Sequence, residues 1–329
     1  MFRNSNRFHA FTIVVDTGIF CGTINYQIEE DFTIKSYAKI NIHLEILNRR
    51  VDNYHNLFSL MAELDLYDLL KLEYSDLSKS SGETTVEILN GGGEFASIID
   101  GIPEDKNLIS IAVKKYMSEL GLGGNFVFSL IKNIPSGAGL GGGSSNAATA
   151  LRIVSETLGR DFDDILLNAA SSTGSDIPFF LKGGFAFVEG RGELVSPFDF
   201  IDNSFILLIN NGIHVNTGSA YESLHKPASD MIFDCTVKKS LIKERISLKS
   251  QWKAIFGNDF EATVFTSHPQ IEQYKENLYN SGAFFSAMSG SGSTVFGLYE
   301  SEENAKKAKK NLEMSGNRVY LTKFRSLKN

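Results

Sequence analysis

A glycine-rich segment near the middle of the chain has the residue types of a phosphate-binding site. Five of the seven residues from Gly137 to Gly143 are glycine. Glycine lets the backbone turn tightly and approach a ligand, so that successive N–H groups point at an anion, and a helix that follows adds its positive N-terminal end. The alternative, a flexible connection between a strand and a helix, seldom needs so many glycines. The segment therefore predicts a loop that binds phosphate.

The spacing of these glycines does not by itself identify the phosphate compound. Gly137, Gly139 and Gly142 match the dinucleotide pattern G-x-G-x-x-G, but that pattern belongs in the first strand-helix unit of a parallel sheet. Here a long β-rich stretch precedes the loop, and the acidic residue Glu156 lies inside the helix that follows. A P-loop is excluded because no Lys-Ser/Thr pair follows the glycines, and the lack of His-Arg-Asp and Asp-Phe-Gly disfavours a protein kinase.

Further motifs resemble those of one superfamily of small-molecule kinases. The segment 135–148 resembles the phosphate-binding motif of the galactokinase, homoserine kinase, mevalonate kinase and phosphomevalonate kinase (GHMP) superfamily, and the blocks 38–41 and 289–294 agree with it. Within this superfamily, the segments 39–41, 52–55 and 174–180 resemble the 4-diphosphocytidyl-2-C-methyl-D-erythritol kinase family. The resemblance covers about residues 32–325, and Asn53 and Ser175 replace the Gly and Ala that are more frequent in the family.

The resemblance implies an α+β fold of two domains. A ribosomal-protein-S5-domain-2-like α/β domain that binds ATP is expected over residues 32–195, and a ferredoxin-like α+β sandwich over residues 196–329. The implied reaction is the ATP-dependent phosphorylation of the 2-hydroxyl of 4-diphosphocytidyl-2-C-methyl-D-erythritol in the non-mevalonate isoprenoid pathway. Two alternatives stay open: another acceptor of the superfamily, such as homoserine or a mevalonate, and a nucleotide-binding module without catalysis.

Asp176 and Lys39 are the residues to which the resemblance assigns catalysis. Asp176 would accept the proton of the acceptor hydroxyl, and the ammonium of Lys39 would keep that carboxylate ionised and help to activate the alcohol. Taken alone, Asp176 is more simply interpreted as a helix N-cap before Pro178, and Lys39 as a solvated lysine on a strand. The presence of both residues favours an enzyme over a binding module.

The resemblance also implies a subsite for the cytosine of the substrate. Tyr54 would stack on the base, His55 would hydrogen-bond to its edge, and Tyr221 would cover its other face. Asn41, in the same motif as Lys39, is expected to bind the substrate as well. The three rings are the residues that distinguish this acceptor from homoserine or a mevalonate. The alternative for them is burial in the core, most of all for Tyr221.

A second subsite is expected for ATP. It would include Asn107 and the whole glycine loop: Pro135, Ser136, Gly137, Ala138, Gly139, Leu140, Gly141, Gly142, Gly143, Ser144 and Ser145. Magnesium (Mg²⁺) is required to bridge the phosphates of ATP, and such ions keep several waters and few protein ligands. The hydroxyls of Ser144 and Ser145 are weak ligand candidates, and no dedicated protein metal site is expected.

Sequence periodicity predicts the elements that position these residues. Apolar and polar residues alternate from Phe32 to Lys39, which predicts one strand, and a second strand is expected over Ile40–Leu47. The segment 175–178 is expected to be a loop. Helices are expected over 107–120, 147–158, 163–172, 240–255 and 271–281 and after Ser301, and strands over 57–72, 126–131, 205–209, 293–299 and 318–324.

Composition and charge exclude several other classes of protein. The chain has 329 residues, with 32 Lys+Arg against 39 Asp+Glu and a formal net charge of −7, which argues against nucleic acid as a partner. Its apolar runs are far shorter than the ~20 residues of a membrane span, and Cys21 and Cys235 lack disulfide or zinc-ligand spacing. We expect a cytoplasmic protein, a monomer or weak homodimer, that binds small molecules. Residues 1–31 form an N-terminal extension to which no role is assigned.

Overall fold

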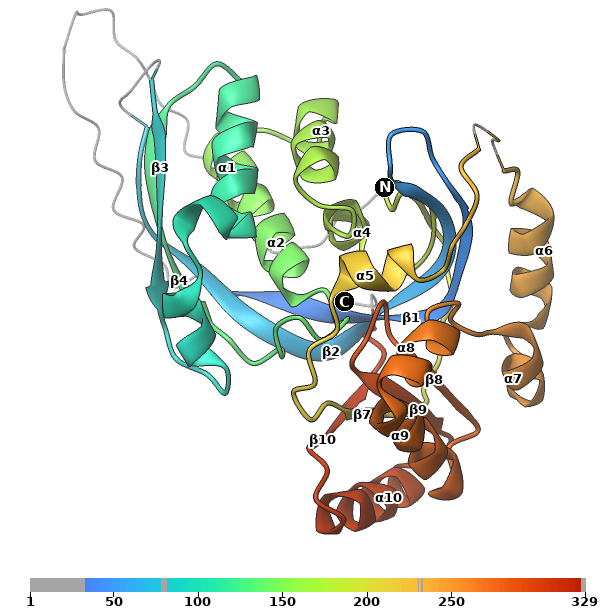
Figure 1. Ribbon diagram of the computed structural model, residues 1–329. Helices are drawn as coiled ribbons and strands as arrows, with labels where there is room; N and C mark the ends of the chain where they lie inside the picture. The colour runs from blue at the N-terminus through green and yellow to red at the C-terminus, as the bar shows by residue number, and fades with distance from the viewer. Residues whose placement is uncertain (1–32, 78–81, 230, 232, 327–329) are drawn as a thin grey trace, which may run out of the picture.

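The computed structural model in Figure 1 contains a six-stranded sheet and a four-stranded sheet, each covered by helices. It describes residues 33–77, 82–229, 231 and 233–326. The extension at 1–31 and Cys21 lie outside the described residues. None of the helices in the described part of the chain is both long enough and apolar enough to span a membrane.

A long antiparallel hairpin forms the centre of the larger sheet. Its strands are β1, Thr33–Arg49, and β2, His55–Asp76. The two strands expected over 32–39 and 40–47 are therefore one strand. The pairing shifts register between Tyr37 and Ala38 and again between Asn41 and His43. Such bulges interrupt the alternation of inward and outward side chains, which is why the pattern suggested two strands.

The rest of this sheet forms around β2. The strand order is β3-β4-β2-β5-β6, with β1 paired to β2, and only β3 and β4 run parallel. Sequence analysis did not identify β3, β5 or β6, which are short and lie at or near the sheet edges. The strands are β3 Thr84–Asn90, β4 Gly124–Ile131, β5 Phe185–Gly190 and β6 Leu194–Pro197.

Four helices cover one side of this sheet in Figure 1: α1 Leu108–Glu119, α2 Gly142–Thr157, α3 Asp164–Thr173 and α4 Ile177–Lys182. The side chain of Asn107 caps α1 by accepting a hydrogen bond from the N–H of Ile109, and Asp163 caps α3 in the same way. Helix α4 overlaps the expected loop at 175–178 in its first two residues, and the sequence analysis did not predict a helix here. Five of its six residues are buried, so it shows no helical alternation of apolar and polar residues.

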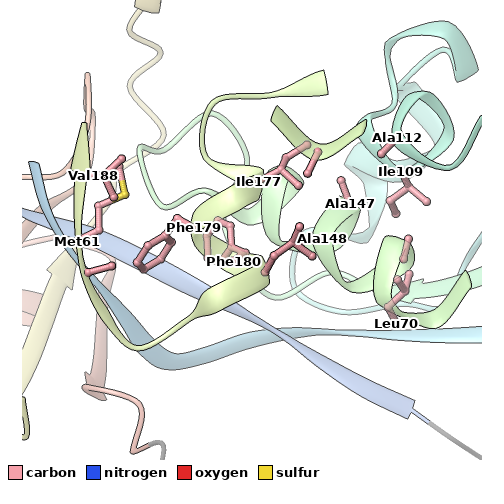
Figure 2. Packing of buried hydrophobic residues seen from close by; sticks show 14 of the residues in the cluster. Met61, Leu70, Ile109, Ala112, Ala147, Ala148, Ile177, Phe179, Phe180 and Val188 are labelled. Carbon is pink, nitrogen blue, oxygen red and sulfur yellow. The ribbon is translucent and has the colours of Figure 1, made fainter. Parts of the chain in front are cut away.

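The core beneath α4 fixes its position on the sheet. Figure 2 shows Phe179 and Phe180 of α4 between Met61 of the sheet and Ala148 of α2. Both phenylalanines are almost fully buried, at 0% and 2% exposed. Burial of each such side chain contributes about 1.5–3 kcal/mol. The residue that precedes α4, Asp176, is therefore held by a well-packed helix.

The smaller sheet has the strand order β10-β7-β9-β8, with every neighbouring pair antiparallel. Chain order and strand order together match the expected ferredoxin-like sandwich. The strands are β7 Phe205–Ile209, β8 Phe285–Met288, β9 Val295–Tyr299 and β10 Val319–Lys323. The α-helices are α5 Thr217–Glu222, α6 Thr236–Arg245, α7 Trp252–Ile255, α8 Glu261–Ser267, α9 Pro269–Asn280 and α10 Glu302–Met314. The single helix expected over 240–255 is divided between α6, a short 3-10 helix and α7.

Two connections hold the sheets against each other. At the edge of β1, the N–H of Leu44 donates to the carbonyl of Gly257 over 2.9 Å, and the N–H of Asp259 donates back to the carbonyl of Leu44 over 2.9 Å. After β10, the Arg325 guanidinium donates to the buried Glu63 carboxylate over 2.8 Å. The first contact involves β1 and the second involves β2, so both strands of the hairpin are tied to the part of the chain that contains the smaller sheet.

Candidate active site

A cavity of about 420 Å³ lies where the glycine loop, β1 and the turn between β8 and β9 meet. It contains most of the chemically active side chains that the sequence singles out. The lining includes Lys39, Asn41, Gly137, Gly139, Gly141, Ser144, Ser175, Asp176, Arg191, Tyr221, Gly290, Ser291 and Gly292. The cavity therefore brings together the three motif blocks at 38–41, 135–148 and 289–294.

Left-handed backbone and close packing both require glycine in the loop. Gly139 has φ of +77° and Gly141 has φ of +69°, a region that residues with a Cβ rarely adopt. A Cβ at Gly139 would lie 2.1 Å from the carbonyl oxygen of Ser289, and one at Gly141 would lie 2.7 Å from the ring of Phe180. Helix α2 begins directly after Gly141, so its first N–H groups open toward the loop. This geometry suits an anion.

Three successive carbonyls of the loop are bound by the protein. The N–H of Thr294 donates to the carbonyl of Ala138 over 3.2 Å, and the N–H of Lys39 donates to that of Leu140 over 2.9 Å. Between them, the Ser289 hydroxyl donates to the carbonyl of Gly139 over 2.8 Å. These bonds fix the loop from two sides and leave its N–H groups to face a phosphate. The side chains of Ala138 and Leu140 are buried, so these residues contribute backbone only.

Lys39 and Asp176 form an ion pair in the cavity. The Nζ of Lys39 lies 3.4 Å from Oδ2 of Asp176 and donates to Oδ1 of Asn41 over 2.6 Å. The amide of Asn41 donates in turn to the hydroxyl of Ser59 over 2.9 Å. Lys39 is only 3% exposed, so it is not a solvated strand lysine. Asp176 occupies the N-cap position of α4, but its side chain makes no capping hydrogen bond, which leaves the carboxylate oriented toward Lys39.

Of the aromatic residues singled out, Tyr221 lines the cavity, and His55 packs against it. The rings of His55 and Tyr221 are stacked, with centroids 4.9 Å apart and planes at 25°. At this spacing no base fits between them. Burial lowers the pKa of His55, and the charges of Arg49 and Lys226 lower it further. Burial also raises the pKa of Tyr221 to about 12. Both rings are therefore neutral near pH 7, and each can donate one hydrogen bond.

Tyr54 and Asn107 lie apart from this stacked pair. Tyr54, in the turn between β1 and β2, is 51% exposed, and the Arg191 guanidinium lies 4.9 Å from the centroid of its ring. Asn107 is absent from the lining of the main cavity and lines a separate depression of about 250 Å³, together with Ile88, Ile99 and Ser110. The structure thus groups His55 and Tyr221 with Lys39 and Asp176, while Asn107 is placed elsewhere.

Comparisons with known proteins identify the family. The sequence matches the GHMP kinases N terminal domain over residues 107–184 and the GHMP kinases C terminal domain over residues 237–316. It is 35% identical to the 4-diphosphocytidyl-2-C-methyl-D-erythritol kinase of Syntrophus aciditrophicus over 84% of this chain and 92% of that protein. The enzyme of the same name from Bacteroides fragilis is 36% identical over 82% and 93%. The chain belongs to the 4-diphosphocytidyl-2-C-methyl-D-erythritol kinase family.

Solved structures agree with this assignment. A crystal structure of 4-(cytidine 5'-diphospho)-2C-methyl-D-erythritol kinase matches with a TM-score of 0.69 and 29% identity, over 90% of this chain and all (100%) of that one. The homoserine kinase of Cytophaga hutchinsonii matches with a TM-score of 0.63 at 21% identity, over 92% and 97%, and shares the fold. The chain is thus an ATP-dependent small-molecule kinase with the two-domain GHMP fold.

Two residues of the kinase site were missed by sequence reasoning. Arg191 reaches the cavity from the turn between β5 and β6, and its only sequence signal is its place between Gly190 and Gly192. Asn258 is 7% exposed, and its amide donates to the carbonyls of Met288 and Gly290 over 2.7 and 2.8 Å. It thereby fixes the turn that carries Gly290. No local pattern marks Asn258, because its partners lie some 30 residues away.

No dedicated metal site appears among the described residues. Within residues 33–77, 82–229 and 233–326, no group of three or more His, Cys, Asp or Glu side chains is arranged to hold a metal ion. The cavity does offer the Asp176 carboxylate and the Ser144 hydroxyl near the glycine loop. Such a sparse donor set fits Mg²⁺, which is bound through one or two carboxylates together with substrate phosphates and water.

Proposed function

We propose that this kinase transfers the γ-phosphoryl group of ATP to the 2-hydroxyl of 4-diphosphocytidyl-2-C-methyl-D-erythritol, a step of the non-mevalonate isoprenoid pathway. One observation carries the proposal. The ion pair of the buried Lys39 and the partly exposed Asp176 lies in the same cavity as the glycine loop and the aromatic ring of Tyr221. A phosphate donor, a proton acceptor and a surface for a base are thus within reach of one another.

Asp176 is the general base of this reaction. Its carboxylate accepts the proton of the 2-hydroxyl as the hydroxyl oxygen attacks the γ-phosphorus, and the bond from that phosphorus to the bridging oxygen of ADP breaks. Lys39, whose Nζ lies 3.4 Å from Oδ2 of Asp176, places a positive charge beside the acceptor oxygen and so helps to activate the alcohol. Asn41 holds Lys39 in place through its 2.6 Å hydrogen bond, so its effect on the substrate is partly through that lysine.

The glycine loop binds the phosphates of ATP through its N–H groups and the N-terminus of α2. Mg²⁺ would neutralise the charge of the phosphates, and the hydroxyl of Ser144, which lines the cavity, would help to hold it. The adenine occupies the depression beside Asn107. Leu108, the next residue, lies 3.5 Å from the Cβ position at Gly143, which connects this depression to the loop. The buried hydroxyl of Ser110, which lines the depression, has no protein partner.

His55, Tyr221 and Tyr54 bind the cytosine. The stacked pair of His55 and Tyr221 presents ring faces and two donors, and the exposed ring of Tyr54, next to His55 in the chain, is assigned to the other face of the base. A neutral imidazole offers both a donor and an acceptor to the edge of the base. The proposal includes a cytoplasmic enzyme that works as a monomer or a weak homodimer.

A coupled assay of ADP release tests the proposal. The purified kinase is given ATP, Mg²⁺ and one acceptor at a time: 4-diphosphocytidyl-2-C-methyl-D-erythritol, homoserine or mevalonate. Turnover with the cytidine-linked acceptor alone is expected. Equal or faster turnover with homoserine or mevalonate would show that the protein has the activity of another branch of the superfamily. ATP binding without any turnover would show that the protein is a nucleotide-binding module without catalysis.

A further inference from the structure

Arg191 brings a positive charge into the cavity on a tight turn. The turn joins β5 to β6 and has left-handed glycines on both sides of the arginine, with φ of +69° at Gly190 and +125° at Gly192. A Cβ at Gly192 would lie 2.8 Å from the backbone oxygen of Ser175. The turn therefore packs directly against the residue that precedes Asp176, and only glycine permits this approach.

The guanidinium of Arg191 has no carboxylate partner among the described residues. Its Nη2 donates to the carbonyl of Ser171 over 3.1 Å, and its Cζ lies 4.9 Å from the centroid of the Tyr54 ring. The Glu193 carboxylate nearby accepts from the backbone N–H of Arg191 over 2.7 Å. Asp52 is paired with Arg50 over 2.8 Å. Of the five N–H donors of an arginine, several are left for a ligand.

The charges that line the cavity do not cancel without a ligand. Lys39 and Arg191 are the Lys and Arg residues of the lining, and Asp176 is its one Asp or Glu. Lys39 already contacts Asp176 and Asn41. The lining thus carries one more positive than negative charge, and the acidic group that attracts Arg191 from outside it, Asp52, is already paired with Arg50. A half-buried guanidinium of this kind is stabilised by an anionic ligand, and its planar fork matches two phosphate oxygens.

We propose that Arg191 binds the diphosphate that joins the cytidine to the acceptor alcohol, and so selects a diphosphate-linked substrate. The inference rests on the proposed function. The diphosphate must lie between the base and the alcohol, and Arg191 lies between the groups assigned to these two ends. On one side it contacts Tyr54, and on the other its turn packs on Ser175, next to Asp176. The phosphates of ATP are bound elsewhere, by the glycine loop.

Binding of cytidine and of CDP separates this role from a merely structural one. Titrations are made by calorimetry with the ATP site filled by a non-hydrolysable ATP analogue. Arg191→Met is expected to weaken CDP binding about 10- to 100-fold, the range for a charge-assisted hydrogen bond. Cytidine has no phosphate for Arg191 to contact. The affinity of Arg191→Met for cytidine should therefore differ from that of the wild type by less than about 2-fold. Arg191→Lys keeps the charge but loses the planar guanidinium. Its affinity for CDP should lie between those of the wild type and Arg191→Met.

Arg245→Met is the matched control, because it removes one positive charge from the exposed end of α6, outside the cavity. It should bind both ligands as the wild type does. In turnover, Arg191→Met should raise KM for the cytidine-linked acceptor far more than it lowers kcat. The measured affinity of the wild type for CDP should also fall with added salt more steeply than that of Arg191→Met.

Three results overturn the inference. They are equal losses of cytidine and CDP affinity in Arg191→Met, an unchanged CDP affinity, or a loss confined to the ATP analogue. Each of these can occur while the wild type still phosphorylates the cytidine-linked acceptor, in which case the proposed function stands and the role of Arg191 is wrong. A wild type that does not use that acceptor refutes the proposed function itself.

Discussion

Replacement of Asp176 by Asn removes the proposed general base with little change of shape. The amide cannot accept the alcohol proton, and general-base catalysis typically contributes 10²–10⁴-fold, or about 3–5 kcal/mol of barrier. Little stability is expected to be lost. Asp176 makes no capping hydrogen bond, its side chain is 29% exposed, and Lys39 keeps its hydrogen bond to Asn41. An ion pair this accessible to water contributes about 1 kcal/mol or less.

The measurement is kcat at saturating ATP and acceptor, with thermal unfolding to verify the fold. Asp163→Asn is the matched control, because Asp163 is a true N-cap, bound to the N–H of Leu166 over 2.8 Å, and lies outside the cavity. Asn caps a helix as well as Asp does, so this control should keep both fold and kcat. A wild-type kcat in Asp176→Asn would refute the base assignment, and positioning alone would then explain catalysis.

Lys39→Met extends the same test to the partner of Asp176. It should also lower kcat, because the site loses the positive charge that helps to activate the acceptor alcohol beside Asp176. If the two groups act as a unit, the double variant Lys39→Met/Asp176→Asn should lose less than the product of the two single effects. Losses that multiply fully would show that the two side chains act independently, contrary to the mechanism proposed above.

Three further variants test other parts of the site. Gly141→Val should impair ATP binding and turnover, because a Cβ there would lie 2.7 Å from the Phe180 ring and the backbone has a φ of +69°. Unchanged ATP affinity in calorimetry would show that the loop does not bind ATP. His55→Ala should weaken cytidine-substrate binding and spare ATP. Burial lowers the pKa of His55, so the contribution of this residue to stability is complete above pH 6.5 and is lost as pH falls below that value. The free energy of unfolding of the wild type, measured with denaturant, should therefore fall more steeply below pH 6.5 than that of His55→Ala. The same dependence on pH in both proteins would contradict this prediction. Asn258→Ala leaves two buried carbonyls without a donor and should lower the free energy of unfolding by about 2–4 kcal/mol, measured with denaturant; a loss near zero would show that Asn258 does not fix the turn.

Motif spacing was sufficient to find residues that the structure brings together in one cavity. The glycine loop, Lys39 and Asp176 have residue types that chemistry restricts, and the structure places all of them in one cavity. Hydrophobic periodicity was sufficient for the longer helices, such as α1, where Asn107 is the N-cap. In both cases the information is local, because it comes from residues close together in the chain.

The parts that were missed depend on contacts between distant residues. Helix α4 is buried on almost every side, so its apolar run carries no period. The bulges in β1 arise from its pairing with β2 and are not visible in β1 alone. Arg191 acquires its place because the turn between β5 and β6 folds onto Ser175. Asn107 was expected to contact ATP; it caps α1 and lies outside the lining of the main cavity, in a separate depression.

The two sheets must be docked for the phosphate loop to have its shape. Lys39 of β1 binds the carbonyl of Leu140, while Ser289 and Thr294, from the smaller sheet's turn, bind those of Gly139 and Ala138. Lys39 therefore contacts both parts of the proposed site: its backbone N–H binds the glycine loop, and its Nζ lies 3.4 Å from Asp176, the proposed general base. Because one residue contacts both, a displacement of the smaller sheet that moves the loop also disturbs the geometry at Asp176. In the proposed mechanism, the packing of the two sheets therefore sets the distance between the loop and the base.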